Sequence, residues 1–117
     1  MKWTNKDLDI SIIKISAENL LCLEIGDSNS IEIGEKLYLL SNSTGYDENE
    51  MLNEIFISKV KSTLKVVGET TTNYVEDVIK LNNDINYENN GGAILNENGE
   101  LLGIASSKVN SVIPINR

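Results

Sequence analysis

Short apolar segments separated by turn residues recur along this chain of 117 residues, and they constrain its fold more than any other feature. Isoleucine, leucine and valine dominate the segments, and branched side chains suit the pleated, half-buried surface of a β-strand. No segment shows a convincing helical period. The pattern predicts strands at residues 10–15, 20–25, 36–40, 55–60, 64–67, 74–81, 93–95, 101–105 and 112–115. Several strands at this spacing indicate an all-β sandwich or barrel.

The turn residues support this pattern. The Asn98-Gly99 pair can adopt the positive φ that a tight hairpin requires, so we expect strands 93–95 and 101–105 to pair around it. Two polar stretches, residues 42–50 and 68–73, are predicted to be exposed loops. Neither has the composition of a domain linker, so the chain is one small domain or part of a larger one.

The composition excludes several classes of function. Hydrophobic residues make up 40% of the chain and there is one proline, which favours a folded chain over a disordered one. A formal net charge of −8 is unsuited to a phosphate backbone, so nucleic acid is not an expected partner. The apolar runs are far shorter than the ~20 residues that span a bilayer. We therefore expect no membrane partner, and a cytoplasmic location if Met1 is the native start.

Thiol and metal chemistry find little support in the sequence. Cys22 is the only cysteine and the chain has no histidine, so a cysteine-based metal site lacks ligands. The apolar neighbours of Cys22 favour a buried structural thiol over a reactive nucleophile. The acidic residues Asp47, Glu48 and Glu50 lack the alternating spacing of a calcium-binding loop. We therefore expect no metal and no cofactor.

The most specific signal lies in residues 84–104. They contain Asn89-Asn90-Gly91-Gly92-Ala93, then an Asn-Gly-Glu-Leu hairpin and an apolar Gly-Ile pair. This segment resembles the nucleophile loop and following hairpin of HtrA-type serine proteases, where the pattern runs Ile-Asn-Pro-Gly-Asn-Ser-Gly-Gly-Ala. Residues 9–15, 23–28, 33–42, 57–60 and 112–115 resemble further parts of the same family in one colinear order. Such an order is stronger support than any single short match.

The resemblance implies a fold and a division of the chain. It implies the C-terminal half of a trypsin-like, chymotrypsin-fold serine protease, hence an all-β chain built on a six-stranded Greek-key barrel. Residues 1–25 would be a remnant of the first barrel with its linker. Residues 26–117 would form the second, C-terminal barrel.

The resemblance also assigns catalytic positions, of which this chain retains only the aspartate. Asp9 takes the position of the aspartate that orients the catalytic histidine, and Asn90 takes that of the nucleophilic serine. A serine attacks only when a histidine removes its proton, and an asparagine amide cannot be activated in this way. Glu88 stands where the oxyanion loop has glycine, with Asn89 beside it, and its charge would oppose a developing oxyanion. Because the chain has no histidine, we interpret Asp9 as a strand-entry residue or a surface carboxylate rather than as a catalytic residue.

These departures predict a chain without peptidase activity of its own. We expect a peptide-binding or protein-binding module, because a protease cleft pairs with an extended peptide through its backbone and this pairing survives loss of the nucleophile. By resemblance the cleft would be formed by Leu102, Gly103, Ile104, Ala105, Ser106, Val112 and Ile113. Two alternatives stay open. The chain is half of a split serine endopeptidase completed by a partner chain, or a structural domain that forms a homodimer through an unpaired strand edge.

Overall fold

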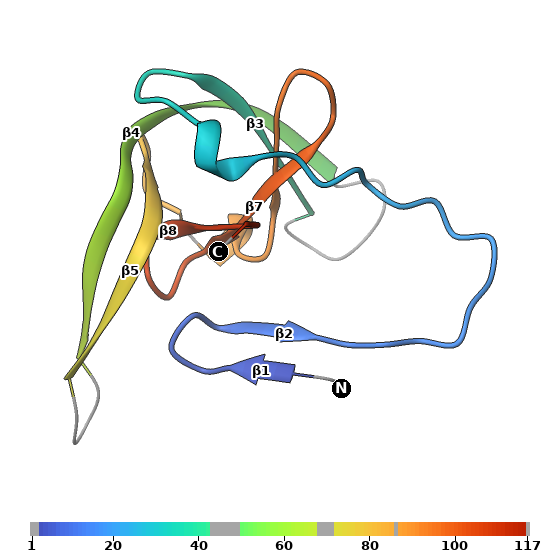
Figure 1. The fold of residues 1–117 in the computed structure, drawn as a ribbon, viewed down its shortest axis with the longest axis horizontal. Helices are drawn as coiled ribbons and strands as arrows, with labels where there is room; N and C mark the ends of the chain where they lie inside the picture. Colours follow the sequence, from blue (N-terminus) through green and yellow to red (C-terminus); the bar gives the residue numbers. More distant parts are fainter. Residues whose placement is uncertain (1–2, 43–49, 68–71, 86, 117) are drawn as a thin grey trace.

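The computed structural model describes residues 3–42, 50–67, 72–85 and 87–116, which form β-strands joined by turns and two short 3-10 helices (Figure 1). The strands are β1 (Trp3–Asn5), β2 (Ile10–Ile12), β3 (Lys36–Asn42), β4 (Glu50–Val67), β5 (Thr72–Leu81), β6 (Ala93–Leu95), β7 (Leu101–Ser106) and β8 (Ser111–Pro114). The 3-10 helices are η1 (Ser28–Ser30) and η3 (Tyr87–Asn89). Within the described residues, no helix is long and apolar enough to cross a membrane.

Six of the strands close into a barrel. Their order around the barrel is β3-β4-β5-β8-β7-β6, and β6 pairs with β3 to complete the circle. The consecutive strands β3, β4 and β5 are antiparallel neighbours, and β6 returns to lie beside β3. A fourth strand that returns to the side of the first defines a Greek key. The predicted all-β Greek-key barrel is therefore confirmed.

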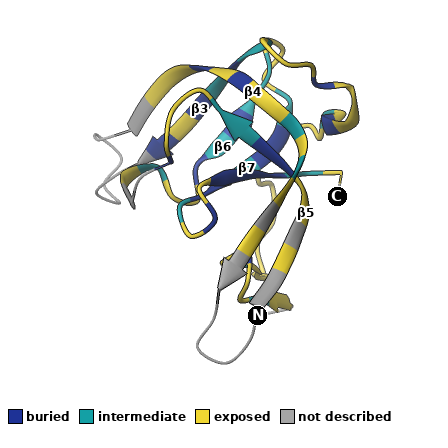
Figure 2. Ribbon diagram, turned by 90° about the vertical axis from the view of Figure 1, so that its left-hand side faces the viewer, coloured by how far each residue is buried: buried dark blue, intermediate teal, exposed yellow. Residues whose placement is uncertain are grey.

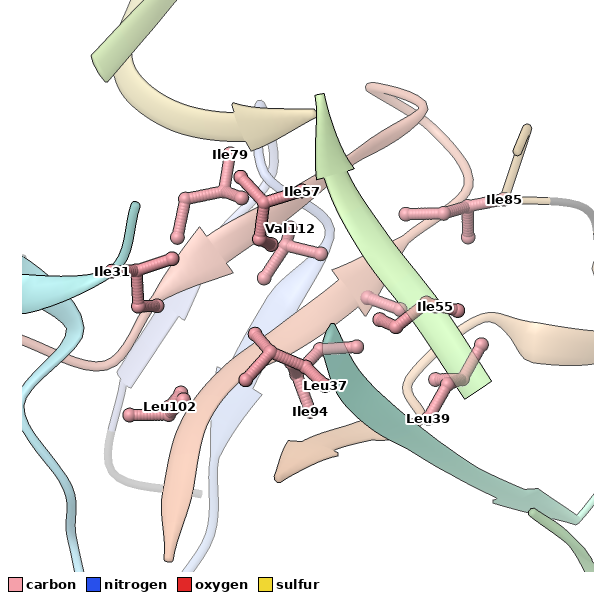
Figure 3. Close-up of a cluster of buried hydrophobic side chains, with 11 residues drawn as sticks. Ile31, Leu37, Leu39, Ile55, Ile57, Ile79, Ile85, Ile94, Leu102 and Val112 are labelled. Atoms are coloured by element: carbon pink, nitrogen blue, oxygen red, sulfur yellow. The ribbon is translucent and has the colours of Figure 1, made fainter. Parts of the chain in front are cut away.

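The alternation of side chains along the strands fills the barrel. Leu37 and Leu39 on β3, and Ile55 and Ile57 on β4, are each no more than 3% exposed. Residues two apart in a strand point to the same face, so each pair lies on the inner wall. Figure 3 shows these side chains converging with those of the other strands; the remaining buried members of this cluster are Ile31, Ile79, Ile85, Ile94, Leu102, Ala105 and Val112.

The barrel strands were largely predictable. The predicted strands at 36–40, 74–81, 93–95, 101–105 and 112–115 correspond to β3, β5, β6, β7 and β8 within a few residues. The segments 55–60 and 64–67, predicted as separate strands, are parts of the single strand β4. The register shifts three times between Ile57 and Leu64, and Lys61 has a φ of 50°. Bulges of this kind bend a strand without ending it, and β4 and β5 extend beyond the barrel as a largely exposed hairpin (Figures 1 and 2).

A second, smaller sheet precedes the barrel. Strands β1 and β2 form an antiparallel hairpin, and β1 was not predicted. The turn of this hairpin is anchored on the barrel by Leu8, which is buried with Val78, Val109 and Ile113. The chain then runs in an extended path to η1 (Figure 1). The predicted division of the chain at residue 25 falls on this path and stays a prediction.

Three expectations for the N-terminal segment are wrong, wholly or in part. Residues 20–25 form no strand apart from an isolated bridge between Ile25 and Leu101, and the predicted strand at 10–15 ends at Ile12. Cys22 is exposed rather than buried. These errors share a cause, since the apolar residues from Ile13 to Leu23 lie outside the barrel and have no described sheet to pack against.

One predicted turn is confirmed, and the two predicted polar loops lie largely outside the described residues. The hairpin at Asn98-Gly99 is present, because β6 pairs with β7 and the N–H of Glu100 donates to Oδ1 of Asn96 at 2.9 Å. Gly99 has a φ of 78°, whereas Asn98 does not have positive φ. Residues 43–49 and 68–71 of the two predicted polar loops, with Asp47 and Glu48, lie outside the described residues.

Candidate functional site

The segment between η3 and β6 is fastened to β7 by its backbone. The N–H of Gly91 donates to the carbonyl of Ala105 at 2.8 Å, and the N–H of Ala105 donates to the carbonyl of Gly92 at 2.9 Å. The N–H of Gly92 also donates to the carbonyl of Asn89 at 3.0 Å, which closes a turn around Asn90. Asn90 is therefore held at the tip of this turn, against the C-terminal half of β7.

Local geometry explains the two glycines that follow Asn90. Gly91 has a φ of 80°, in the left-handed region that glycine enters without steric cost. A Cβ on Gly92 would lie 2.7 Å from Cδ1 of Leu39 and 3.0 Å from the carbonyl oxygen of Leu40. The loop can approach β3 this closely only with glycine at position 92.

The side chain of Asn90 bonds to the barrel rather than facing a base. Its Oδ1 accepts a hydrogen bond from the backbone N–H of Ser107 at 2.9 Å, just beyond the end of β7. The neighbouring Asn89 accepts a hydrogen bond from the hydroxyl of Ser41 on β3 at 3.1 Å. Glu88, within η3, is exposed. The two asparagine amides thus hold the loop from both sides.

Asp9 lies at the same end of β7 but is exposed to solvent. It has a φ of 57° and ends the turn that leads into β2. The buried hydroxyl of Ser106 donates to the backbone carbonyl of Leu8 at 2.8 Å. The end of β7 is therefore bonded to the Leu8–Asp9 turn through Ser106 and to Asn90 through Ser107, so Asp9 and Asn90 lie in one region of the structure.

A further asparagine ties the loop to the turn between β7 and β8. Oδ1 of Asn110 accepts the N–H of Ile85 at 2.7 Å, and its Nδ2 donates to Oδ1 of Asp84 at 3.0 Å. The N–H of Asn110 donates to the carbonyl of Ser107 at 3.3 Å, which closes the turn over residues 107–110. This turn is thus bonded to both ends of the loop that contains Asn90.

The residues predicted to form a peptide cleft lie inside the barrel wall. Ile104 pairs with Ala93 on one side and with Ile113 on the other, and Gly103 is similarly paired on both sides. The side chains of Leu102, Ala105, Ser106, Val112 and Ile113 are buried. The first residue beyond β7 whose backbone forms no hydrogen bond with another described backbone group is Lys108, which is exposed.

Three further residues at this end of the barrel could not be identified from sequence motifs. Leu8 supplies the buried anchor and carbonyl, Ser107 is the partner of Asn90, and the Lys108 ammonium donates to the carbonyl of Lys6. Their roles depend on contacts across 17 to 102 residues of sequence, which no local motif encodes.

The comparison with protein families fits this barrel and loop. A family model described as a trypsin-like peptidase domain matches residues 2–104. The chain belongs to the trypsin-like peptidase family. Serine protease HtrA-like from Staphylococcus epidermidis is 28% identical over 110 residues, covering 92% of this trypsin-like chain and 18% of the relative. The protein of the same name from Staphylococcus aureus is 26% identical over 112 residues, covering 92% and 14%.

Solved structures resemble the trypsin-like chain over most of its length. Deg5 superposes with a TM-score of 0.76 at 26% identity, covering 97% of this chain and 53% of Deg5. The HtrA-type protease AlgW with tripeptide gives a TM-score of 0.63 at 26% identity, covering 88% and 35%. The six-stranded barrel matches the barrel of these HtrA-type proteins. The chain spans less than a fifth of the curated relatives and about half of Deg5.

Within the described residues, neither Ser58 with Lys59 nor a cluster of metal-binding side chains forms a second candidate site. The hydroxyl of Ser58 donates to the carbonyl of Leu81 at 3.1 Å, so it is not presented to the adjacent Lys59. Across the residues that the structure describes, no group of three or more His, Cys, Asp or Glu side chains is arranged to hold a metal ion.

Proposed function

We propose that this trypsin-like domain binds an extended peptide or protein segment and does not hydrolyse it. The observation that carries the proposal is the hydrogen bond from the Ser107 N–H to Oδ1 of Asn90 at 2.9 Å. The side chain at the nucleophile position acts as an acceptor for the protein's own backbone. The chain has no histidine to act as the base of a catalytic triad.

The environment of Asp9 supports the same proposal. In a working triad the carboxylate is buried and oriented toward a histidine. Here Asp9 is exposed, and the buried hydroxyl of Ser106 bonds to the Leu8 carbonyl. A histidine supplied by another chain would therefore meet neither a serine at position 90 nor a carboxylate held in the protein interior.

The proposed binding surface is the backbone of the exposed residue Lys108, just beyond the end of β7. Extended peptides bind sheet edges by donating and accepting backbone hydrogen bonds. The paired strands leave little free backbone before Ser106, whereas the N–H and C=O of Lys108 are not engaged by other described backbone groups. We therefore place the peptide beside Lys108, displaced toward the C-terminus from the cleft predicted from sequence.

A proline substitution tests this surface. Lys108 is the second residue of the turn closed by the Asn110 N–H and the Ser107 carbonyl, a position where proline is favoured. Lys108→Pro thus removes one backbone donor while the turn is retained, and Lys108→Ala is the matched control for loss of the ammonium. Fluorescence anisotropy with labelled unstructured peptides should rise on binding to the wild type and to Lys108→Ala.

The expected result for Lys108→Pro is weaker binding by about fivefold or more, because one backbone hydrogen bond contributes on the order of 1 kcal/mol. Equal binding by Lys108→Pro and Lys108→Ala would contradict the proposed surface. A fall in anisotropy that a serine-directed inhibitor abolishes would reveal hydrolysis and overturn the non-catalytic proposal.

A second candidate function is docking of another protein chain on the N-terminal segment. Single exposed apolar residues are ordinary, but clusters of them mark interaction surfaces. Residues 3–25 expose eight large apolar side chains, namely Trp3, Ile12, Ile13, Ile15, Leu20, Leu21, Leu23 and Ile25. A partner chain that supplies a further barrel, or a second copy of this chain, would cover them.

Sedimentation velocity separates these partners. A second copy predicts a concentration-dependent dimer that Ile13→Asp combined with Leu21→Asp dissociates, whereas a partner chain predicts a monomer at all concentrations of the isolated chain. The matched control is Ile33→Asp, since Ile33 is 67% exposed but follows this segment. A dimer that is insensitive to the double substitution would exclude the N-terminal segment as its interface.

A further inference from the structure

The turn after β7 holds both backbone groups of Ser107 inside the protein. Its N–H donates to Oδ1 of Asn90 at 2.9 Å, and its carbonyl accepts the N–H of Asn110 at 3.3 Å. Neither group is available to a bound peptide. The next residue, Lys108, is exposed, and its backbone groups bond to no described backbone group.

The side chain of Asn90 makes the contact that holds the Ser107 N–H inside the protein, whereas no such contact within the described residues holds the backbone of Lys108. The backbone of the Asn90 loop is itself anchored, through Gly91 and Gly92, on Ala105 of β7. Because both ends of the Asn90–Ser107 hydrogen bond rest on β7, the amide determines how the chain leaves the strand. A side chain without an acceptor would free the Ser107 N–H to turn toward solvent.

We infer that Asn90 is a positioning residue, whose amide orients Ser107 inward and thereby presents the Lys108 backbone to an extended peptide. The inference rests on the proposed peptide-binding function and names Asn90 as a residue on which the peptide affinity depends. The position that would bear the nucleophile in an active protease serves here to shape the binding edge. An amide suits this role because its carbonyl accepts a hydrogen bond at any pH in the working range without carrying charge.

Three variants isolate the contribution of the amide. Asn90→Ala removes the acceptor, and Asn90→Asp keeps an acceptor oxygen of the same reach. Asn98→Ala, in the exposed β6–β7 turn, is the matched control for loss of an asparagine side chain. Asn90 is itself exposed, so all three variants are expected to fold, which thermal unfolding verifies.

The first measurement is residue-resolved hydrogen exchange by NMR on the free protein. Exchange of the Ser107 amide should accelerate on the order of tenfold in Asn90→Ala, since a single hydrogen bond of this kind is lost. Asn90→Asp should restore the slow exchange, and Asn98→Ala should leave it unchanged. Exchange of Ser107 that is equal in the wild type and in Asn90→Ala overturns the inference, whether or not a peptide binds.

The second measurement is the affinity for the labelled peptide that the wild type binds. Asn90→Ala should weaken binding by about threefold to tenfold, with recovery in Asn90→Asp and no change in Asn98→Ala. Faster exchange at Ser107 with unchanged affinity would show that Asn90 holds the turn but does not position the peptide, which also overturns the inference. A wild-type chain that binds no peptide overturns the proposed function, and Ser107 exchange alone then decides whether Asn90 holds the turn.

Discussion

The hydroxyl oxygen of Ser106 lies 2.8 Å from the backbone carbonyl oxygen of Leu8, across 98 residues of sequence, and this buried hydrogen bond joins the N-terminal hairpin to the barrel. Leu8 itself packs among Val78, Val109 and Ile113. An isolated two-stranded hairpin is marginally stable in water. The position of β1 and β2 therefore depends on this junction more than on their own pairing.

Replacing Ser106 with alanine should lower the free energy of unfolding by about 1–3 kcal/mol, because the buried Leu8 carbonyl loses its donor. Urea unfolding followed by circular dichroism measures the change. The matched control is Ser107→Ala, since the contacts of Ser107 named above use its backbone. Equal stability of the two variants would show that the Leu8 carbonyl finds another donor.

Leu8→Ala should lower the free energy of unfolding by about 2–5 kcal/mol, the usual cost of replacing a buried leucine with alanine. Leu8 is 4% exposed, whereas Leu21 is fully exposed and lies in the same N-terminal segment. Leu21→Ala is accordingly expected to change the stability by less than about 0.5 kcal/mol. Thermal unfolding of both variants tests the anchor, and similar values for the two would place Leu8 outside the cooperative unit.

The two glycine environments predict different kinds of destabilisation. In Gly92→Ala the new Cβ would lie 2.7 Å from Leu39 and 3.0 Å from two carbonyl oxygens, so overpacking should cost about 1–3 kcal/mol. Gly34 has open space around it but a φ of 88°, so Gly34→Ala should cost about 1 kcal/mol from backbone strain alone. Hydrogen exchange separates them, because only Gly92→Ala should expose the Ala105 amide, whose partner is the Gly92 carbonyl.

The barrel was predictable from sequence because its signals are local. Alternating apolar residues mark the inner face of β3, and the turn at Gly99 requires a conformation that glycine favours. The N-terminal segment was not, since Leu20 and Leu23 have the composition of strand residues but no sheet beside them. A strand needs a partner as well as a propensity, and local sequence does not say whether a partner is present.

The sequence predicted which residues belong to the candidate site but not the hydrogen bonds between them. The resemblance identified Asp9, Glu88 and Asn90, but the hydrogen bond of Asn90 to Ser107 depends on how two distant segments meet. The predicted cleft residues stay a prediction, but the structure shows that Gly103 and Ile104 on β7 are paired on both sides and offer no free strand edge.

Introducing serine at position 90 should not give the chain peptidase activity. Asn90→Ser supplies a hydroxyl, but the chain contains no histidine to remove its proton, and Glu88 adds negative charge on the preceding 3-10 helix. Cleavage of a quenched fluorescent peptide should stay at the rate of buffer alone for both the wild type and Asn90→Ser. Hydrolysis that appears in Asn90→Ser and is blocked by a serine-directed inhibitor would mean that another group acts as the base. In that case the loop would have the geometry of a working protease, and Asn90 alone would account for the expected inactivity of the wild type.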